Sequence, residues 1–190
     1  MKLIPYVFLA VWFASSQCAY AHETLPTVAN IELERYAGRW YEVARLPNRF
    51  ERDCAGDITA AYALRPDQKI DVLNQCRLSD GSFKSARGIA RSADSQSALR
   101  LEVRFAPAWL GVFPFVWGDY WIIDLAEDYG WSMVGSPDKR NLWLLSRQPV
   151  LDDAQMARLL EKAKALGFGT EKIVYVKNGT RETAKIPRVQ

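Results

Sequence analysis

The segment Leu99-Arg100-Leu101-Glu102-Val103-Arg104-Phe105 alternates apolar and charged residues without a break. Successive side chains of a β-strand point to opposite faces, so this alternation predicts a strand with one buried face and one solvated face. A strand with an apolar face is stable only within a larger sheet. The rest of the chain must therefore supply the other strands.

Seven further segments with strand character lie on both sides of this one. Turn-forming residues separate them, as in Arg65-Pro66-Asp67-Gln68-Lys69, and no long helical pattern comes between them. Such a series predicts a meandering antiparallel sheet, and hence a sandwich or a barrel. In chain order, the eight expected strands cover residues 39–46, 58–64, 70–76, 82–91, 99–105, 120–125, 131–135 and 142–147.

Helical patterns are confined to the two ends of this strand series. Asn30 can cap a short turn over residues 31–34. A longer helix begins after Asp152 or Asp153 and ends before Gly167. Apolar side chains recur along one face of it, which predicts that it packs against the sheet. That face consists of Met156, Leu159, Leu160, Ala163 and Leu166.

The first 21 residues have the features of an export signal. Lys2 gives a positive start, an apolar run covers residues 3–14, and Ala19-Tyr20-Ala21 fits the pattern at which signal peptidase cuts. The apolar run is shorter than the about 20 residues that cross a membrane. We therefore expect a signal peptide over residues 1–21 and an N-terminal extension over residues 22–29.

Cys18 offers an alternative end for this signal. Cleavage before a cysteine that is then lipidated would tether the protein to a membrane. Gln17 directly precedes Cys18, whereas a lipoprotein signal has a small residue at that place. Cleavage after Ala21 is therefore favoured over a lipid anchor at Cys18.

Cysteine and histidine content narrows the possible chemistry. Cleavage after Ala21 leaves Cys54 and Cys76, and a pair of cysteines in an exported chain predicts a disulfide. The single histidine, His22, would be the mature N-terminus, which argues against histidine-based triads and zinc sites in the folded domain. We expect neither a metal nor a cofactor.

The charge of the chain argues against a nucleic-acid partner. Its 25 basic and 22 acidic residues give a net charge of +3, and they are spread along the chain without a block of one sign. An evenly mixed, solvated surface explains this pattern.

Three short motifs resemble the lipocalin family when taken in order. They are Gly38-Arg39-Trp40-Tyr41-Glu42, Gly118-Asp119-Tyr120 and Leu144-Leu145-Ser146-Arg147-Gln148-Pro149. Within the family, residues 40–45, 48–51 and 142–147 are most similar to the bacterial outer-membrane lipocalins and the apolipoprotein D branch. The resemblance covers residues 30–177. It implies an all-β fold, an eight-stranded antiparallel up-and-down β-barrel with one C-terminal α-helix packed outside.

The resemblance also assigns roles to three of these residues. Trp40 would plug the closed end of the barrel, and Arg147 would pack across its indole ring as a cation–π contact. Gly38 would let the N-terminal turn pass close to that ring. These roles are structural.

Side-chain parities taken from the family predict which residues face the barrel interior. Small residues at several inward positions favour a ligand cavity over a packed core. Ala44, Ala90 and Leu145 are also expected inside. The predicted ligand-binding residues are Glu42, Ala60, Tyr62, Val72, Asn74, Ala86, Gly88, Leu101, Val103, Phe105, Tyr120, Trp131, Met133 and Trp143.

This apolar lining with a few polar groups suits a small amphiphilic lipid. Burying about 14 methylenes at about 0.8 kcal/mol each gives roughly 11 kcal/mol before entropic costs. The family resemblance implies a lysophospholipid or a fatty acid as ligand, a role in envelope lipid maintenance, and a place in the periplasm or at the outer membrane. We expect a monomer or a weak homodimer without enzymatic activity.

An apolar segment interrupted by glycine and proline joins the fifth and sixth strands at residues 107–117, the mouth loop. We expect it at the open end of the barrel, opposite Trp40. It could be a lid, a lip that touches a membrane, or a subunit contact. Its large apolar residues are Trp109, Leu110, Phe113, Phe115 and Trp117.

Two alternative functions remain open. Cys76 shares the parity of the inward residues and could serve a cysteine-dependent, lipid-modifying enzyme, if its thiol is free. The mouth loop could instead make the protein a membrane-docking or partner-docking module. At the C-terminus, a short strand is expected over residues 172–177, followed by a polar tail over residues 178–190 that starts with the sequon Asn178-Gly179-Thr180.

Overall fold

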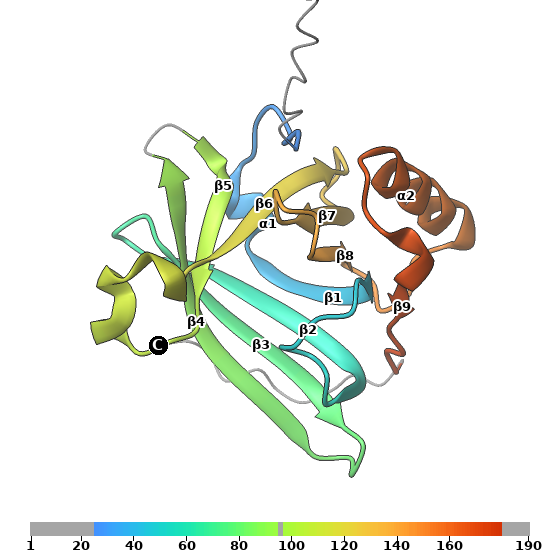
Figure 1. Ribbon diagram of the computed structural model, residues 1–190, viewed down its shortest axis with the longest axis horizontal. Helices are drawn as coiled ribbons and strands as arrows, with labels where there is room; N and C mark the ends of the chain where they lie inside the picture. The colour runs from blue at the N-terminus through green and yellow to red at the C-terminus, as the bar shows by residue number, and fades with distance from the viewer. Residues whose placement is uncertain (1–24, 95–96, 180–190) are drawn as a thin grey trace, which may run out of the picture.

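The computed structural model describes residues 25–94 and 97–179, which contain a closed antiparallel β-barrel of eight strands (Figure 1). Strands pair with their neighbours in chain order, and β1 pairs with both β2 and β8, which closes the sheet. The predicted barrel is confirmed. The strands are β1 (Gly38–Arg45), β2 (Cys54–Leu64), β3 (Ile70–Leu78), β4 (Phe83–Asp94), β5 (Ser97–Arg104), β6 (Gly118–Leu125), β7 (Trp131–Gly135) and β8 (Leu142–Ser146).

The long helix α2 (Asp153–Ala165) packs on the outside of the barrel, as predicted (Figure 1). Asp152 caps it, because its carboxylate accepts a hydrogen bond from the N–H of Gln155 at 2.9 Å. The predicted cap at Asn30 is wrong, since α1 (Leu33–Tyr36) begins three residues later. No helix within residues 25–94 and 97–179 is long and apolar enough to cross a membrane. The shorter elements are the 3₁₀-helices η1 (Ala108–Val112), η2 (Pro114–Val116) and η3 (Thr170–Lys172), and the strand β9 (Val174–Tyr175).

The barrel wall separates two apolar cores. The inner core fills the closed end of the barrel, and the outer core lies between the wall and α2. Strands β1, β6, β7 and β8 contribute residues to both cores, so each of them buries both of its faces. The inner core includes Tyr36, Trp40, Ile70, Val72, Ala90, Leu101, Ile122, Val134 and Leu145. The outer core includes Val43, Ala44, Ile123, Met133, Leu144, Leu159 and Ala163.

Strand β7 faces the opposite way from the prediction. Val134 belongs to the inner core, whereas Met133 and Trp131 pack against α2. Trp131 lines an external groove together with Arg158. The prediction that Trp131 and Met133 line the barrel interior is therefore wrong. Because both faces of β7 are buried, hydrophobicity alone does not mark its inner face.

A β-bulge at Val43 exchanges the inner and outer faces of β1. Before the bulge, Glu42 lies opposite an inner-core leucine of β8. After it, Ala44 belongs to the outer core and Arg45 lies opposite Trp143. Arg45 thus takes the inward place predicted for Ala44, because the extra residue of a bulge shifts the alternation by one.

The C-terminal segment closes a seam between β1 and β2. The two strands pair along the first half of β1 and then diverge, and β9 pairs with the edge of β1 beyond that point. The side chain of Asn178 bridges the seam: Nδ2 donates to the backbone oxygens of Glu42 (2.7 Å) and Pro149 (3.1 Å), and Oδ1 accepts from the N–H of Ile58 (3.1 Å). Asn178 is therefore part of the folded domain and not of a free tail. The predicted signal peptide, Cys18, His22 and residues 180–190 lie outside the described residues.

Candidate functional site

Trp40 and Arg147 close one end of the barrel, here called the floor, as predicted. The guanidinium carbon of Arg147 lies 3.8 Å from the centroid of the Trp40 ring. Its nitrogens donate to the backbone oxygens of residues 35–37 and 39 at 2.7–3.1 Å. Gly38 has a φ of +93°, which favours glycine, and Arg147 lies close beside it. The floor is thus tied to the N-terminal turn by one charged side chain.

A chain of four hydroxyl groups lies directly above this floor. Tyr62 and Tyr120 are joined at 2.8 Å, Tyr120 and Tyr36 at 3.0 Å, and Tyr36 and Ser132 at 3.2 Å. Ser132 Oγ donates to the backbone oxygen of Asp124 at 3.5 Å. Either oxygen can be the donor in each of the three bonds between hydroxyl groups. The hydroxyl groups therefore satisfy one another above the floor.

Burial raises the pKa values of Tyr36, Tyr62 and Tyr120 above the ordinary value of a tyrosine. The three side chains therefore stay neutral over the physiological pH range. The hydroxyl chain brings no charge to the barrel interior.

The lumen opens from the floor toward the opposite end, here called the mouth. Inward residues near the floor are buried, namely Ala60, Val72, Ala90 and Leu101. Inward residues nearer the mouth keep accessible surface, namely Asn74, Ala86, Gly88, Val103, Phe105 and Trp143. Because these side chains point inward, the inner face of the barrel keeps accessible surface toward the mouth. All the predicted lining residues except Trp131 and Met133 lie on the inner face.

Gly88 is small for a different reason from the one predicted. A Cβ atom at Gly88 would lie 2.8 Å from Cδ1 of Phe105 and 2.8 Å from the backbone oxygen of Arg104. The space that Gly88 leaves is therefore filled by the Phe105 ring. The lumen is narrower here than the row of small residues on β4 suggests.

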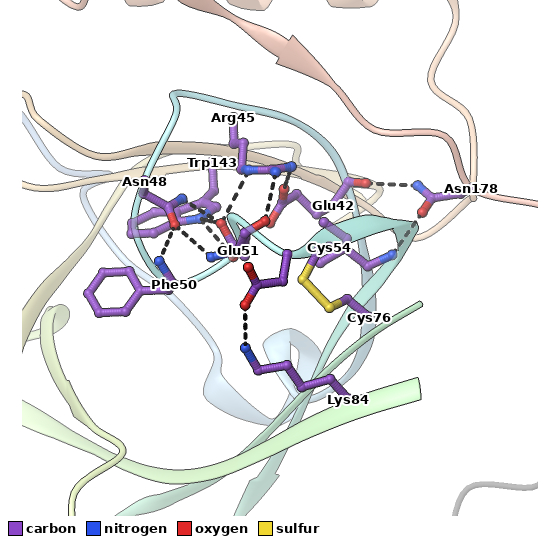
Figure 2. The surroundings of a disulfide bond; sticks show 12 residues. Glu42, Arg45, Asn48, Phe50, Glu51, Cys54, Cys76, Lys84, Trp143 and Asn178 are labelled. Atoms are coloured by element: carbon purple, nitrogen blue, oxygen red, sulfur yellow. Dashed lines mark hydrogen bonds and ion pairs between the residues drawn. A yellow bond between two sulfur atoms is a disulfide. The ribbon is translucent and has the colours of Figure 1, made fainter. Parts of the chain in front are cut away.

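A buried charged cluster lies at the mouth and joins β1 to the loop that follows it (Figure 2). Arg45 Nη1 donates to Glu42 Oε1 at 3.0 Å, and Arg45 Nε lies 3.4 Å from Glu51 Oε2. Trp143 Nε1 lies 3.3 Å from each Glu51 carboxylate oxygen, and Asn48 Nδ2 donates to Glu51 Oε2 at 2.5 Å. The loop is thus fastened to the lumen wall through the carboxylate of Glu51.

This cluster contains two carboxyl groups and one cation. Burial raises the pKa of Glu42 well above its ordinary value, and the negative charge of Glu51 raises it further, while Arg45 lowers it. Two carboxyl groups thus share one guanidinium group, and the cluster has no positive charge in excess.

The predicted disulfide between Cys54 and Cys76 is present and ties β2 to β3 beside this cluster (Figure 2). Cys54 lies opposite Leu78, because two register shifts at the start of β2 move it past Cys76. A nucleophilic cysteine must be a free thiolate. Since Cys76 is bridged, the cysteine-dependent alternative loses its nucleophile.

The mouth loop stands outside the lumen and does not cover it. Trp117 stacks under Arg91, whose Cζ lies 3.9 Å from the ring centroid, and Arg104 lies 5.1 Å from the same ring. Both arginines project from the outer face of β4 and β5. The loop therefore extends sideways from the barrel (Figure 1), with Trp109 72% and Phe115 80% exposed. This position argues against the lid interpretation. Phe113 is also exposed, and Leu110 is half-buried.

Sequence reasoning missed Arg45 and Glu51 as residues of the mouth. The motif of residues 48–51 contributed to the family resemblance, but nothing in it indicated an inward carboxylate. A signal was available in the spacing of Glu42 and Arg45, which have opposite charges three residues apart in a strand. Regular alternation would place them on opposite faces, so their pairing required the bulge.

Comparison with known protein families gives a match to the lipocalin-like domain over residues 31–178. Temperature-induced lipocalin-1 of Arabidopsis thaliana is 37% identical over 151 residues, covering 78% of this chain and 80% of that protein. Outer membrane lipoprotein Blc of Vibrio cholerae is 35% identical over 161 residues, covering 84% of this chain and 90% of that protein. Apolipoprotein D of Mus musculus is 31% identical over 157 residues, covering 78% and 77%.

Solved structures with the same fold are more distant in sequence. Insecticyanin from the tobacco hornworm Manduca sexta superposes with a TM-score of 0.61 at 18% identity, covering 83% of this chain and 85% of that one. Apocrustacyanin C2 superposes with a TM-score of 0.60 at 15% identity, covering 78% and 81%. These two likenesses concern the architecture alone.

Proposed function

Because this chain belongs to the lipocalin family, whose members bind small hydrophobic ligands, we propose that it binds and stores or carries a small amphiphilic lipid such as a lysophospholipid or a fatty acid. The observation that carries the proposal is the gradient of burial along the lumen, from a sealed floor to an accessible, mainly apolar wall that ends in a polar cluster at the mouth. Such a site accommodates an apolar chain and leaves a polar end at the mouth.

Mass spectrometry of organic extracts from the purified protein tests this function directly. We expect a single-chain amphiphile to be recovered. Displacement of an uncharged fluorescent probe, N-phenyl-1-naphthylamine, then measures affinity. A lumen without any bound or competing amphiphile would contradict the proposal.

Val103→Trp should obstruct the lumen, since Val103 faces inward and keeps accessible surface. We expect probe affinity to fall about tenfold or more, which corresponds to about 1.4 kcal/mol. Glu102→Trp introduces the same side chain on the outer face of the same strand and should leave affinity unchanged. Equal effects of the two variants would place the probe outside the barrel.

We further propose export to the cell envelope and a role in envelope lipid maintenance. Relatives named outer membrane lipoprotein Blc support this location and give weight to the alternative of a lipidated Cys18. Cleavage after Ala21 predicts a mature protein that begins at His22 and stays in the aqueous phase of a detergent partition. A lipidated product that Cys18→Ser abolishes would establish the anchor instead.

The exposure of the mouth loop favours membrane contact as a second property. Trp109 and Phe115 project from one loop, with the exposed Val112 between them. Exposed apolar patches of this kind typically contact a membrane or another protein. Trp109→Ser should reduce co-flotation with phospholipid vesicles, whereas Phe83→Ser, at the exposed β3–β4 turn, serves as the matched control. Unchanged flotation of the Trp109 variant would contradict this role.

A further inference from the structure

We propose that the Glu42–Arg45–Glu51 cluster makes the mouth selective for single-chain lipids whose polar end is uncharged or cationic, and that it disfavours the free carboxylate of a fatty acid. This inference rests on the proposed lipid-binding function and chooses between its two ligand classes. It concerns the polar end of the ligand, whereas the lumen gradient concerns the apolar chain.

The first step is the supply of hydrogen-bond donors at the mouth. The Nη1 of Arg45 bonds to Glu42, and its Nη2 donates to the backbone oxygen of Glu51 at 3.3 Å. Asn48 Nδ2 and Trp143 Nε1 are directed at the Glu51 carboxylate. These donors are already occupied by the side chains of Glu42 and Glu51 and by a backbone oxygen, and a ligand carboxylate would have to compete for them. The remaining donor, Arg45 Nε, is buried without a hydrogen-bond partner and lies 3.4 Å from Glu51 Oε2.

The second step is the balance of charge. Arg45 is shared by the two carboxyl groups of Glu42 and Glu51, so an added carboxylate would be an uncompensated charge in a buried place. An ammonium group would be favoured, because it can pair with the carboxylate of Glu42. An uncharged hydroxyl or ester can hydrogen-bond to the cluster at no cost in charge.

Two other cations lie near the mouth, and both are exposed. Arg49 is exposed and stacks 5.1 Å from the centroid of Phe50, and Lys84 lies 3.4 Å from Asp53. Exposed charges of this kind contribute little to binding. On the lumen wall nearer the mouth, Asn74 Oδ1 is a buried acceptor without a hydrogen-bond partner among the described residues. Outside the cluster, these groups therefore offer a ligand an acceptor but no buried positive charge.

Three ligands with the same sixteen-carbon chain test the proposal: palmitate, monopalmitoylglycerol and hexadecylamine. Each competes near neutral pH with N-phenyl-1-naphthylamine bound to the full mature protein. We expect palmitate to compete about tenfold less well than the other two. Equal competition by all three would overturn the selectivity and leave the proposed function intact. Competition by none of them would overturn the proposed function itself.

Glu51→Gln removes one negative charge from the cluster. Palmitate affinity should rise about tenfold and hexadecylamine affinity should fall about tenfold, with monopalmitoylglycerol unchanged. Asp53→Asn removes the same charge from the exposed rim and should alter none of the three affinities. An unchanged order of ligands in the Glu51 variant would overturn the proposal.

Glu42→Gln provides a second test that leaves Glu51 and its contacts to the loop in place, because it changes only the charge of the side chain on β1. Hexadecylamine should lose affinity about tenfold, since the carboxylate that would pair with it is gone, while palmitate and monopalmitoylglycerol keep theirs. This variant decides the outcome if Glu51→Gln also weakens monopalmitoylglycerol. An unchanged hexadecylamine affinity in Glu42→Gln would then overturn the proposal.

Discussion

The floor and the mouth of this barrel are built on opposite principles. At the floor, an arginine caps four backbone oxygens and an indole ring, and four hydroxyl groups satisfy one another. At the mouth, two carboxyl groups share one arginine, and an apolar loop projects into solvent. The comparison suggests that the floor supplies stability, whereas the mouth supplies recognition.

Trp40→Ala should give the largest effect and would test the role of the floor. Trp40 is completely buried, so its removal leaves a large cavity and also removes the partner of Arg147. We expect a loss of about 4 kcal/mol in the free energy of unfolding, measured by urea denaturation. A loss below about 1 kcal/mol would mean that the floor does not carry the stability assigned to it.

Replacing Cys54 and Cys76 by serine together should have the next largest effect. The disulfide joins residues 22 apart in sequence, and opening such a loop costs about 3 kcal/mol through the unfolded state. The loss is measured in urea against the oxidised wild-type protein. The reduced wild-type protein is the control and should unfold at the same urea concentration as the double variant. Because the bridge lies at the mouth, this result would show how much stability the recognition end contributes.

Glu42→Gln should change how stability depends on pH. A raised pKa in the folded state means that the wild-type protein holds a proton that the unfolded chain releases. Stability is therefore full below the ordinary pKa of a glutamate and declines as the pH rises through the raised pKa. The slope is at most about 1.4 kcal/mol per pH unit for one proton. Denaturation at a series of pH values should show this decline in the wild type and its absence in Glu42→Gln. Parallel profiles would contradict the raised pKa of Glu42 in the folded state.

Phe115→Ser should have the smallest effect on stability. Its ring is 80% exposed and stacks on Phe113 at a centroid distance of 5.4 Å. We expect a change within about 0.5 kcal/mol, as for a surface position. A larger loss would mean that the mouth loop supports the barrel and is not free for recognition.

Sequence patterns predicted the strands of this barrel better than the side chains that face its interior. The alternation of residues 99–105 and the turns between strands identify the fold, because the outer face of β5 carries charged, half-buried side chains while Leu101 on its inner face is buried. On β7 the same logic fails. The outer face of β7 is covered by α2, so apolar Trp131 and Met133 are buried there. The inward Ser132 is polar, but it is hydrogen-bonded to Tyr36. The pattern Trp131-Ser132-Met133 therefore predicts the wrong inner face.

The mouth was harder to predict than the floor. Trp40 and Arg147 could be paired from the family motifs, and the structure confirms them. Arg45 could not be placed, because a bulge of one residue at Val43 decides its face and leaves no mark in composition. The partners of Glu51 depend on the path of a loop, which short-range patterns do not determine.

The bridge made by Asn178 has a consequence for the order of events during folding. It joins the backbone groups of Glu42, Ile58 and Pro149, which lie 136, 120 and 29 positions away in the chain. Until it forms, the gap between β1 and β2 is not bridged at this point. Contacts between distant positions form late, since the intervening chain must first be organised. The barrel can therefore be sealed only after the chain has been synthesised through Asn178, so that a residue after the last barrel strand holds the first one in place.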